Sequence, residues 1–193
     1  MKYTFTGVEK TVYGVVLRQI KRIADNVVGG WIEKETNLSH DGDAWVSGDA
    51  WVYGNAQVYG DAQVSGDAWV SGNAQVYGSA QVYGSAQVYG AAQVYGNAQV
   101  SGDAWVYGDA QVYGSAQVSG DAQIKQKNQC INLINLTYSI TATPQNAVVG
   151  CQIKTHKEWL VVTPREAILM GLPKNDYKTF KALLKILFKE VVK

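Results

Sequence analysis

The chain has 193 residues, of which 47% are hydrophobic and 17% are charged, and its formal net charge is +1. No apolar run reaches the roughly 20 residues of a membrane-spanning helix, and residues 1–5 lack the apolar core of a signal peptide. We therefore expect a cytoplasmic protein without a membrane partner. Two cysteines are too few for a disulfide scaffold or a cysteine zinc site, and the low net charge makes nucleic-acid binding an unfavoured function.

The first segment, residues 1–41, carries six basic and five acidic side chains and is predicted to form a β cap. Residues 2–23 have the pattern of two strands joined as a hairpin. Further along, Ile32 and Leu38 are six residues apart, whereas Leu38 and Val46 are eight apart. This spacing predicts a two-residue insertion before the regular repeat that follows.

Residues 42–125 contain a six-residue repeat. Fourteen glycines recur at every sixth position from Gly42 to Gly120, in the unit Gly-[Asp/Asn/Ser/Ala]-Ala-[Gln/Trp]-Val-[Tyr/Ser]. Small, polar, branched and polar side chains alternate within the unit, as in a strand with one buried face. Glycine followed by a short polar residue suits a corner. The fixed short period predicts an all-β solenoid with alanine and valine inside.

The spacing resembles that of the hexapeptide-repeat left-handed β-helix family, in which an aliphatic residue is followed four positions later by a small one. Val46 with Ala50, and Val52 with Ala56, fit this pattern. The resemblance implies a triangular, left-handed parallel β-helix with three hexads in each coil, and a homo-oligomer that is often a trimer. Handedness rests on the resemblance, because parallel crossovers are normally right-handed.

Three hexads, or eighteen residues, per coil would place chemically different columns on the three sides of the solenoid. One side would carry tyrosines beside glutamines, and another would carry tryptophans. Such uncharged aromatic faces normally become interfaces, so we predict a ligand- or partner-binding site there. The predicted binding residues are Tyr59, Tyr77, Tyr95, Tyr113, Gln75, Gln93, Trp51, Trp69 and Trp105.

Residues 126–193 are predicted to form a C-terminal α+β cap with strands and two helices. Residues 130–134 and 148–153 are predicted strands, residues 163–166 have the spacing of a capping box with Pro164 at the first helical position, and Gly171 fits the end of that helix. A last helix near Asn175 would place apolar residues on one side and lysines on another. We expect it to cover the open end of the solenoid or to pack with sister copies; membrane or nucleic-acid binding by its lysines is the alternative.

The segments differ sharply in charge. Residues 42–124 hold seven aspartates and no other charged side chain, whereas residues 125–193 hold eleven basic and four acidic side chains. Their net charges are therefore −7 and +7. This asymmetry would allow the tail to fold back onto the middle, or one copy's tail to meet another copy's middle.

Both ends resemble hexapeptide proteins of phages, prophages and enterobacteria, some of which are labelled putative transferases. Residues 16–20, 30–33 and 37–39, and residues 150–152 with the helices after them, carry this resemblance. Acyltransferases of the hexapeptide family use a histidine base and bind coenzyme A between subunits, but here His40 and His156 both lie outside the repeat. We expect no catalytic residue, no metal and no cofactor.

These patterns lead to three hypotheses about function. The first is a non-catalytic binding protein of phage or prophage type, which sequesters a small ligand such as a nucleotide, or a host protein, to counter a host defence. It would use the aromatic columns or grooves between subunits. The second is a structural scaffold or virion component, and the third is a hexapeptide acyltransferase that uses His40 or His156.

Overall fold

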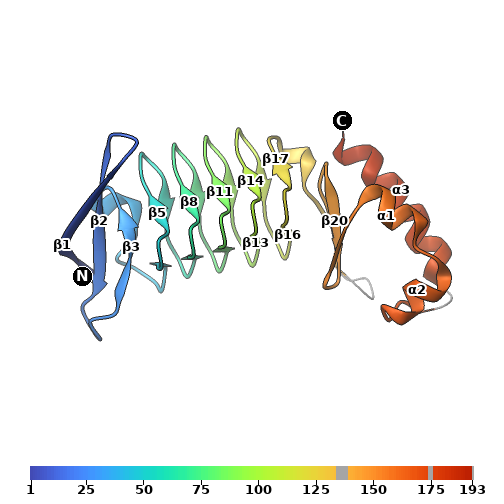
Figure 1. Cartoon of the computed structure of the whole chain (residues 1–193), viewed down its shortest axis with the longest axis horizontal. Coiled ribbons are helices and arrows are strands. Elements are labelled where there is room, and N and C mark those ends of the chain that lie inside the picture. The colour runs from blue at the N-terminus through green and yellow to red at the C-terminus, as the bar shows by residue number, and fades with distance from the viewer. Residues whose placement is uncertain (134–138, 174–175, 193) are drawn as a thin grey trace.

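The computed structural model describes residues 1–133, 139–173 and 176–192. An N-terminal β region, a rod of stacked coils and a C-terminal unit of strands and helices follow one another along the long axis (Figure 1). The three predicted segments therefore occur as separate parts of one elongated molecule.

The rod contains fourteen two-residue strands, each formed by the glutamine or tryptophan of one hexad and the aliphatic residue after it. They are β4 (Trp45–Val46), β5 (Trp51–Val52), β6 (Gln57–Val58), β7 (Gln63–Val64), β8 (Trp69–Val70), β9 (Gln75–Val76), β10 (Gln81–Val82), β11 (Gln87–Val88), β12 (Gln93–Val94), β13 (Gln99–Val100), β14 (Trp105–Val106), β15 (Gln111–Val112), β16 (Gln117–Val118) and β17 (Gln123–Ile124). Strands three elements apart pair in parallel, so Val82 lies between Val64 and Val100. One coil therefore contains three hexads, or eighteen residues.

Three parallel sheets form the sides of the rod. One contains β4, β7, β10, β13 and β16, another contains β6, β9, β12 and β15, and the third contains β5, β8, β11, β14 and β17. The five strands of the first sheet correspond to five coils. The predicted β-solenoid with three hexads per coil is confirmed, and so is the assignment of each column to its side.

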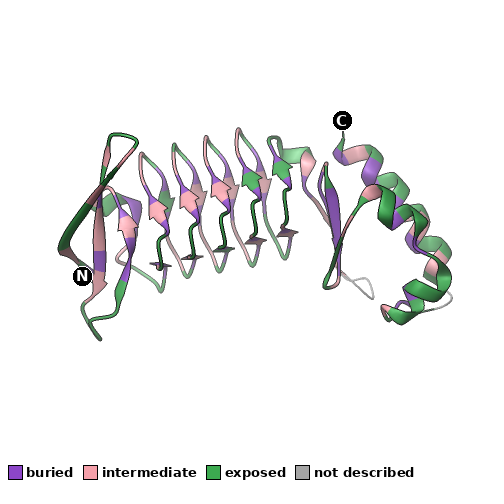
Figure 2. Cartoon of the chain, in the orientation of Figure 1, coloured by how far each residue is buried: buried purple, intermediate pink, exposed green. Residues whose placement is uncertain are grey.

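The interior of the rod is made almost entirely of alanine and valine. Each hexad alanine and each hexad valine or isoleucine is at most 1% exposed (Figure 2). Backbone N–H groups of one coil donate to carbonyls of the next, as Gln81 does to Ala98 at 2.9 Å and Tyr83 to Val100 at 2.9 Å. Apolar burial and satisfied backbone groups together stabilise the stack of coils.

Gly84 shows why the corner of each hexad needs glycine. Its φ of +70° lies in the left-handed region, and a Cβ there would lie 3.0 Å from the N atom and 3.2 Å from the O atom of Gly102 in the next coil. A larger residue would therefore meet backbone strain and an unusually tight contact with the backbone of the next coil. Glycine allows the chain to turn and the coils to approach closely at the same position.

The N-terminal strands β1 (Tyr3–Val12), β2 (Val15–Arg22) and β3 (Val28–Ile32) extend the side that contains β5. β1 and β2 form the predicted antiparallel hairpin, and β3 pairs antiparallel with β2 and in parallel with β5. Ile32 lies beside Val52 and Leu38 beside Val58. The partners in both pairs are two positions further apart in the sequence than partners within the rod, which confirms the predicted two-residue insertion.

A buried asparagine closes the first coil. Asn37, in the short 3-10 segment η1 (Glu35–Asn37), is fully buried, and its Nδ2 donates to Gly54 O at 3.1 Å and to Ala56 O at 2.8 Å. One coil further along the rod, Gly72 O is the carbonyl equivalent to Gly54 O, and it accepts a hydrogen bond from the backbone N–H of Asn55. The Asn37 amide thus replaces the backbone of a missing coil.

The last coil is closed by an antiparallel sheet. After the 3-10 segment η2 (Lys127–Gln129), the strands β18 (Ile131–Leu133), β19 (Ile140–Ala142), β20 (Asn146–Val149) and β21 (Gln152–Thr155) pair in that order. Thr141 Oγ1 accepts a hydrogen bond from Gln117 N–H at 3.0 Å, and Asn146 Nδ2 donates to Ser119 O at 3.1 Å. Side chains of the sheet therefore bond to the open edge of the rod.

Three helices pack on this sheet: α1 (His156–Val161), α2 (Pro164–Leu169) and α3 (Tyr177–Val191) (Figure 1). The prediction of two helices is wrong, because α1 begins with a second capping box at Thr155 and Glu158.

The predicted strand over residues 148–153 is instead a hairpin that turns at Gly150 and Cys151. No helix in the described part of the chain is long and apolar enough to span a bilayer.

Other expectations for this unit have mixed outcomes. The capping box of α2 is confirmed, with Glu166 Oε2 accepting from Thr163 N–H at 2.7 Å, and α3 buries the apolar side predicted for it, including Leu184. Residues 134 and 175, where a strand end and the helix start were predicted, lie outside the described residues. The sheet bonds directly to the last coil, whereas α3 packs on α1, on β19 and on η2, the segment that follows the last coil. The rod is therefore closed mainly by the sheet, and packing of α3 with sister copies stays a prediction.

The opposed charges do not bring the tail back onto the rod within one chain. The ion pairs in the described residues, Arg18 with Glu9 and Arg22 with Asp25, both lie in the N-terminal β region at 3.2 Å. No aspartate of residues 42–124 pairs with a lysine of the described tail. Contact between the tail of one copy and the middle of another stays a prediction.

Candidate functional site

The tyrosines of the β6, β9, β12 and β15 side form one continuous column. The rings of Tyr59 and Tyr77 lie 4.9 Å apart with planes 2° from parallel, those of Tyr77 and Tyr95 lie 4.9 Å apart at 4°, and those of Tyr95 and Tyr113 lie 5.4 Å apart at 14°. This confirms the predicted column. We call this side, with its tyrosines and glutamines, the tyrosine side.

Stacking changes what the tyrosine column can offer to a ligand. Each inner ring, Tyr77 and Tyr95, has a neighbouring ring over both faces, so its edge and hydroxyl remain for contact with a partner. Burial, and then the adjacent phenol, raises the pKa of both Tyr59 and Tyr77. Stacking of flat ligands on the inner rings is therefore incompatible with this geometry, and only the ends of the column keep a ring face without a tyrosine on it.

Glutamines run beside the tyrosines in the same register. Gln75 pairs with Gln93 and Gln93 with Gln111 across the parallel strands, and Gln111 Nε2 donates to Gln93 Oε1 at 3.2 Å. The amides and phenols together make a face without formal charge in its four strands. This face suits hydrogen bonding and apolar contact at the same time.

The tryptophans lie on a different side, next to the N-terminal hairpin. Trp51 and Trp69 are 5.6 Å apart, and the ring of Tyr13, at the hairpin turn, lies 6.2 Å and 6.3 Å from them. Lys10 Nζ lies 4.2 Å from the ring centre of Trp31 and 5.4 Å from that of Trp51. These contacts hold the hairpin against the rod through cation–π and aromatic packing.

Trp105 is separate from this cluster. It is 39% exposed, and in its column it lies between Gln87 and Gln123. As predicted, the nine residues lie on two different sides; on the tryptophan side, Trp51 and Trp69 contact each other whereas Trp105 does not contact them. Sequence reasoning missed Trp31, although the two-residue insertion places it in register with Trp51.

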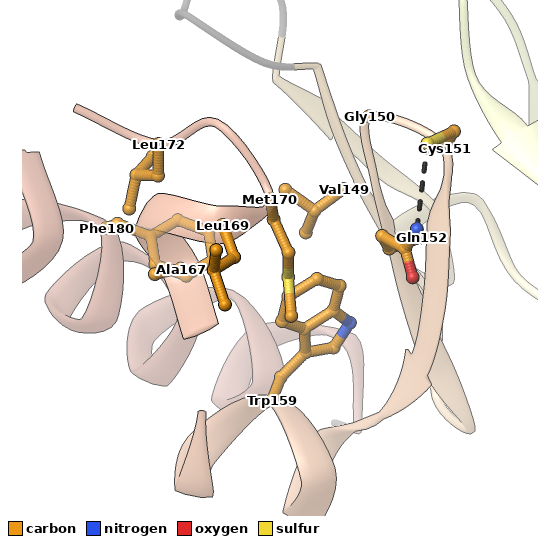
Figure 3. Close-up of a pocket in the computed structure, with 10 residues that line it drawn as sticks. All are labelled: Val149, Gly150, Cys151, Gln152, Trp159, Ala167, Leu169, Met170, Leu172 and Phe180. Atoms are coloured by element: carbon orange, nitrogen blue, oxygen red, sulfur yellow. Dashed lines mark hydrogen bonds between the residues drawn. The ribbon is translucent and has the colours of Figure 1, made fainter. Parts of the chain in front are cut away.

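A cavity of about 250 Å³ lies in the C-terminal unit. Its lining residues come from the β20–β21 turn and from all three helices and their flanking turns: Val149, Gly150, Cys151, Gln152, Trp159, Ala167, Leu169, Met170, Leu172 and Phe180. Figure 3 shows the Met170 side chain beside the Trp159 indole, with Cys151 and Gln152 on the opposite wall. No lining residue carries a formal charge, so the cavity suits an apolar group and offers no cation to a phosphate.

Both histidines are engaged in packing at opposite ends of the molecule. His40 Nδ1 accepts a hydrogen bond from Lys2 N–H at 3.1 Å, and its ring stacks on Tyr3 at 4.3 Å. The ring of His156 stacks on Phe188 at 3.9 Å. This geometry gives the acyltransferase hypothesis no support, because a general base needs free access to the proton it removes.

Comparison with known proteins places the rod among repeat proteins. A family model described as YdcK Beta solenoid repeat matches residues 56–72, 62–78, 68–84, 92–108 and 98–114. The rod is similar to the YdcK solenoid repeat. The overlapping YdcK matches are shifted by six residues, or one hexad, within residues 56–84 and again within 92–114. No curated protein matches the chain.

Proposed function

We propose that this protein is a non-catalytic binding protein that captures its partner on the tyrosine side of the solenoid. The observation that carries the proposal is the column of four stacked tyrosines beside in-register glutamines, on a side whose four strands contain no charged residue. Tyrosine contributes strongly to binding energy at protein interfaces. Because neighbouring rings already hold each tyrosine in place, little side-chain entropy remains to be lost on binding.

The partner proposed for this side is a flat protein surface. Inner ring faces are covered, so a small planar molecule finds no stacking position along the column, whereas a protein can contact the ring edges, hydroxyls and amides together. The two candidates for this partner are a sister copy in a homotrimer and a host protein, and the experiment below separates them.

The finer features of the proposal come from two resemblances, one at the ends of the chain and one in the repeat. They are a phage or prophage origin, sequestration of a host component to counter a host defence, a cytoplasmic location in a bacterium, and a left-handed coil. Residues 16–20, 30–33, 37–39 and 150–152 support the phage or prophage origin and the roles that follow from it, whereas the hexapeptide spacing of residues 42–125 supports the left-handed coil.

The test compares two double variants, each purified together with its bound partners from the cells in which it is expressed. Tyr77→Ala/Tyr95→Ala removes the middle of the tyrosine column, whereas Tyr89→Ala/Tyr107→Ala removes a stacked pair 5.1 Å apart on the tryptophan side. Native mass spectrometry of the purified proteins identifies bound partners and the subunit number. We expect at least a tenfold loss of the partner, or of the trimer, in the first variant and retention in the second. Equal behaviour of the two variants would refute the proposal.

A structural scaffold or virion component is the second candidate. The continuous eight-stranded sheet from β1 to β17, which runs along the whole rod, favours it because such a sheet makes a stiff spacer. Detection of the protein in purified virus particles would support this role.

A further inference from the structure

The tyrosine column stops one position short of the end of its side. Ser39 N–H donates to Val58 O at 2.9 Å, and Leu38 pairs with Val58. Ser39 therefore occupies, over Tyr59, the position that Tyr59 itself occupies over Tyr77. Because serine is much smaller than tyrosine, the space that a fifth tyrosine ring would fill above Tyr59 is not filled by a side chain.

The omitted ring corresponds to a hollow in the structure. This space of about 350 Å³, which we call the column-end hollow, is lined by Glu35, Thr36, Leu38, Ser39, His40, Gln57, Val58 and Tyr59. At the other end of the column the space beside Tyr113 is about 100 Å³, and Tyr113 is 51% exposed. The two ends therefore differ, and the larger space lies at Tyr59.

The walls of the column-end hollow define the chemistry of its ligand. Gln57 supplies an amide, Ser39 and Thr36 supply hydroxyls, and Glu35 supplies a carboxylate acceptor. His40 Nδ1 accepts from Lys2, so its Nε2 carries the hydrogen, and this atom is buried without a partner among the described residues. No lysine or arginine lines the hollow, so a phosphate finds no counter-charge there.

We propose that the column-end hollow binds a planar, uncharged heteroaromatic ring of nucleobase type, stacked on Tyr59 in the place of a fifth tyrosine. Stacking on an aromatic side chain recognises the flat face of a base, and the polar wall matches its N–H and carbonyl groups. This inference rests on the proposed binding role of the tyrosine side and adds a second ligand class at its end.

The experiment measures binding of guanosine and adenosine by isothermal titration calorimetry. Ser39→Tyr fills the hollow with a ring and should weaken nucleoside binding at least tenfold. Ser101→Tyr is the matched control, because it makes the same substitution on another side of the rod, far from the hollow. Ser65, Tyr83 and Ser101 are eighteen residues apart and form one column, so this column already contains a tyrosine. The control variant should leave binding unchanged. The 5′-monophosphates should bind more weakly than the nucleosides, because the hollow is lined by the acidic Glu35 and by no lysine or arginine.

The outcomes separate this inference from the proposed function. Absence of nucleoside binding by the unmodified protein, or equal binding by the Ser39→Tyr variant, overturns the inference. If Ser39→Tyr does not fold, Tyr59→Leu takes its place, since it removes the stacking face and should weaken binding to a similar degree. Loss of nucleoside binding with retained partner capture in Ser39→Tyr would show that the hollow and the tyrosine side act separately. Failure of Tyr77→Ala/Tyr95→Ala to affect the partner refutes the proposed function alone.

Discussion

The rod and the C-terminal unit bury apolar side chains in opposite ways. In the rod the same alanine and valine recur in every coil, and the contacts join residues at equivalent positions of successive coils. The C-terminal unit buries large and different side chains, such as Trp159, Phe180 and Leu184, from separate helices and strands. The rod thus spreads its stability over equal layers, whereas the C-terminal unit depends on a few specific contacts.

The largest effect is expected from a charge inside the rod. Val82→Asp loses the burial of a valine, worth about 1.5–3 kcal/mol, and leaves a buried charge without a partner, which costs about 3–5 kcal/mol more. Because Val82 is fully buried in the middle coil, we expect the rod to unfold at least locally. Urea denaturation followed by far-UV circular dichroism measures the loss.

The neighbouring residue in the same strand provides the control for this change. Gln81 is exposed and points away from the core, so Gln81→Asp should change the free energy of unfolding by less than about 0.5 kcal/mol. If both aspartate variants were equally stable, alternation of buried and exposed residues would not be what stabilises the rod.

A single large residue should matter most in the C-terminal unit. Trp159 is 1% exposed, and its Nε1 donates to Ala147 O at 2.8 Å. Trp159→Ala should destabilise this unit by about 3–5 kcal/mol and leave the rod folded, because the two cores form separate clusters. Hydrogen exchange with mass spectrometry reads the two parts separately.

Val161→Ala is the matched variant on the same helix, since Val161 is 75% exposed, and it should have little effect. Equal loss of protection in the rod and the C-terminal unit of Trp159→Ala would contradict the independence of the two cores.

The smallest effect is an opposite response of the two parts to pH. Burial and then a neighbouring phenol raise the pKa of Tyr59, Tyr77 and Tyr89 in the rod. Above about pH 10 the unfolded chain loses these protons first, so the free energy of unfolding falls as the pH rises. Hydrogen bonds from Thr155 and Thr163 lower the pKa of Glu158 and Glu166, so helix stability is lost as the pH falls below the ordinary glutamate value.

Conservative variants isolate each half of this pH response. Changing Tyr59, Tyr77 and Tyr89 to phenylalanine keeps the rings and should flatten the alkaline decline, while Glu158→Gln/Glu166→Gln should flatten the acid decline of the C-terminal unit. Urea midpoints between pH 3 and 11 measure both slopes. An unchanged alkaline slope in the phenylalanine variant would assign it to other groups.

Sequence reasoning succeeded where the structure repeats and failed where distant segments meet. The columns of Tyr59 and Val82 followed from counting hexads, because each coil uses the same backbone path. The contacts of Tyr13 with Trp51 and Trp69 could not be counted in this way, since they depend on how the hairpin folds over the side of the rod. The role of Ser39 likewise required its register with Val58.

The C-terminal unit shows a different limit. The capping box at Thr163 was recognised in the sequence, but α1 was missed although Thr155 and Glu158 have the same capping-box spacing. The turn at Gly150 and Cys151 was also missed, because it interrupts an apolar stretch that resembles one strand. The sequence pointed to α3 at the end of the rod, but it did not show that Thr141 and Asn146, two polar residues in strands, bond directly to the last coil.

By itself, the sequence determined the solenoid, because a strict hexad period with glycine corners allows one repeating backbone path. Together with the family resemblance, which implied three hexads per coil, it also determined the chemistry of each side. The tertiary structure alone decided which aromatic faces stay open. Ring stacking closes the inner tyrosine faces and the hairpin packs over Trp51, while Ser39 leaves space beside Tyr59. These outcomes depend on side chains that meet across coils and segments, and a one-dimensional period does not contain that information.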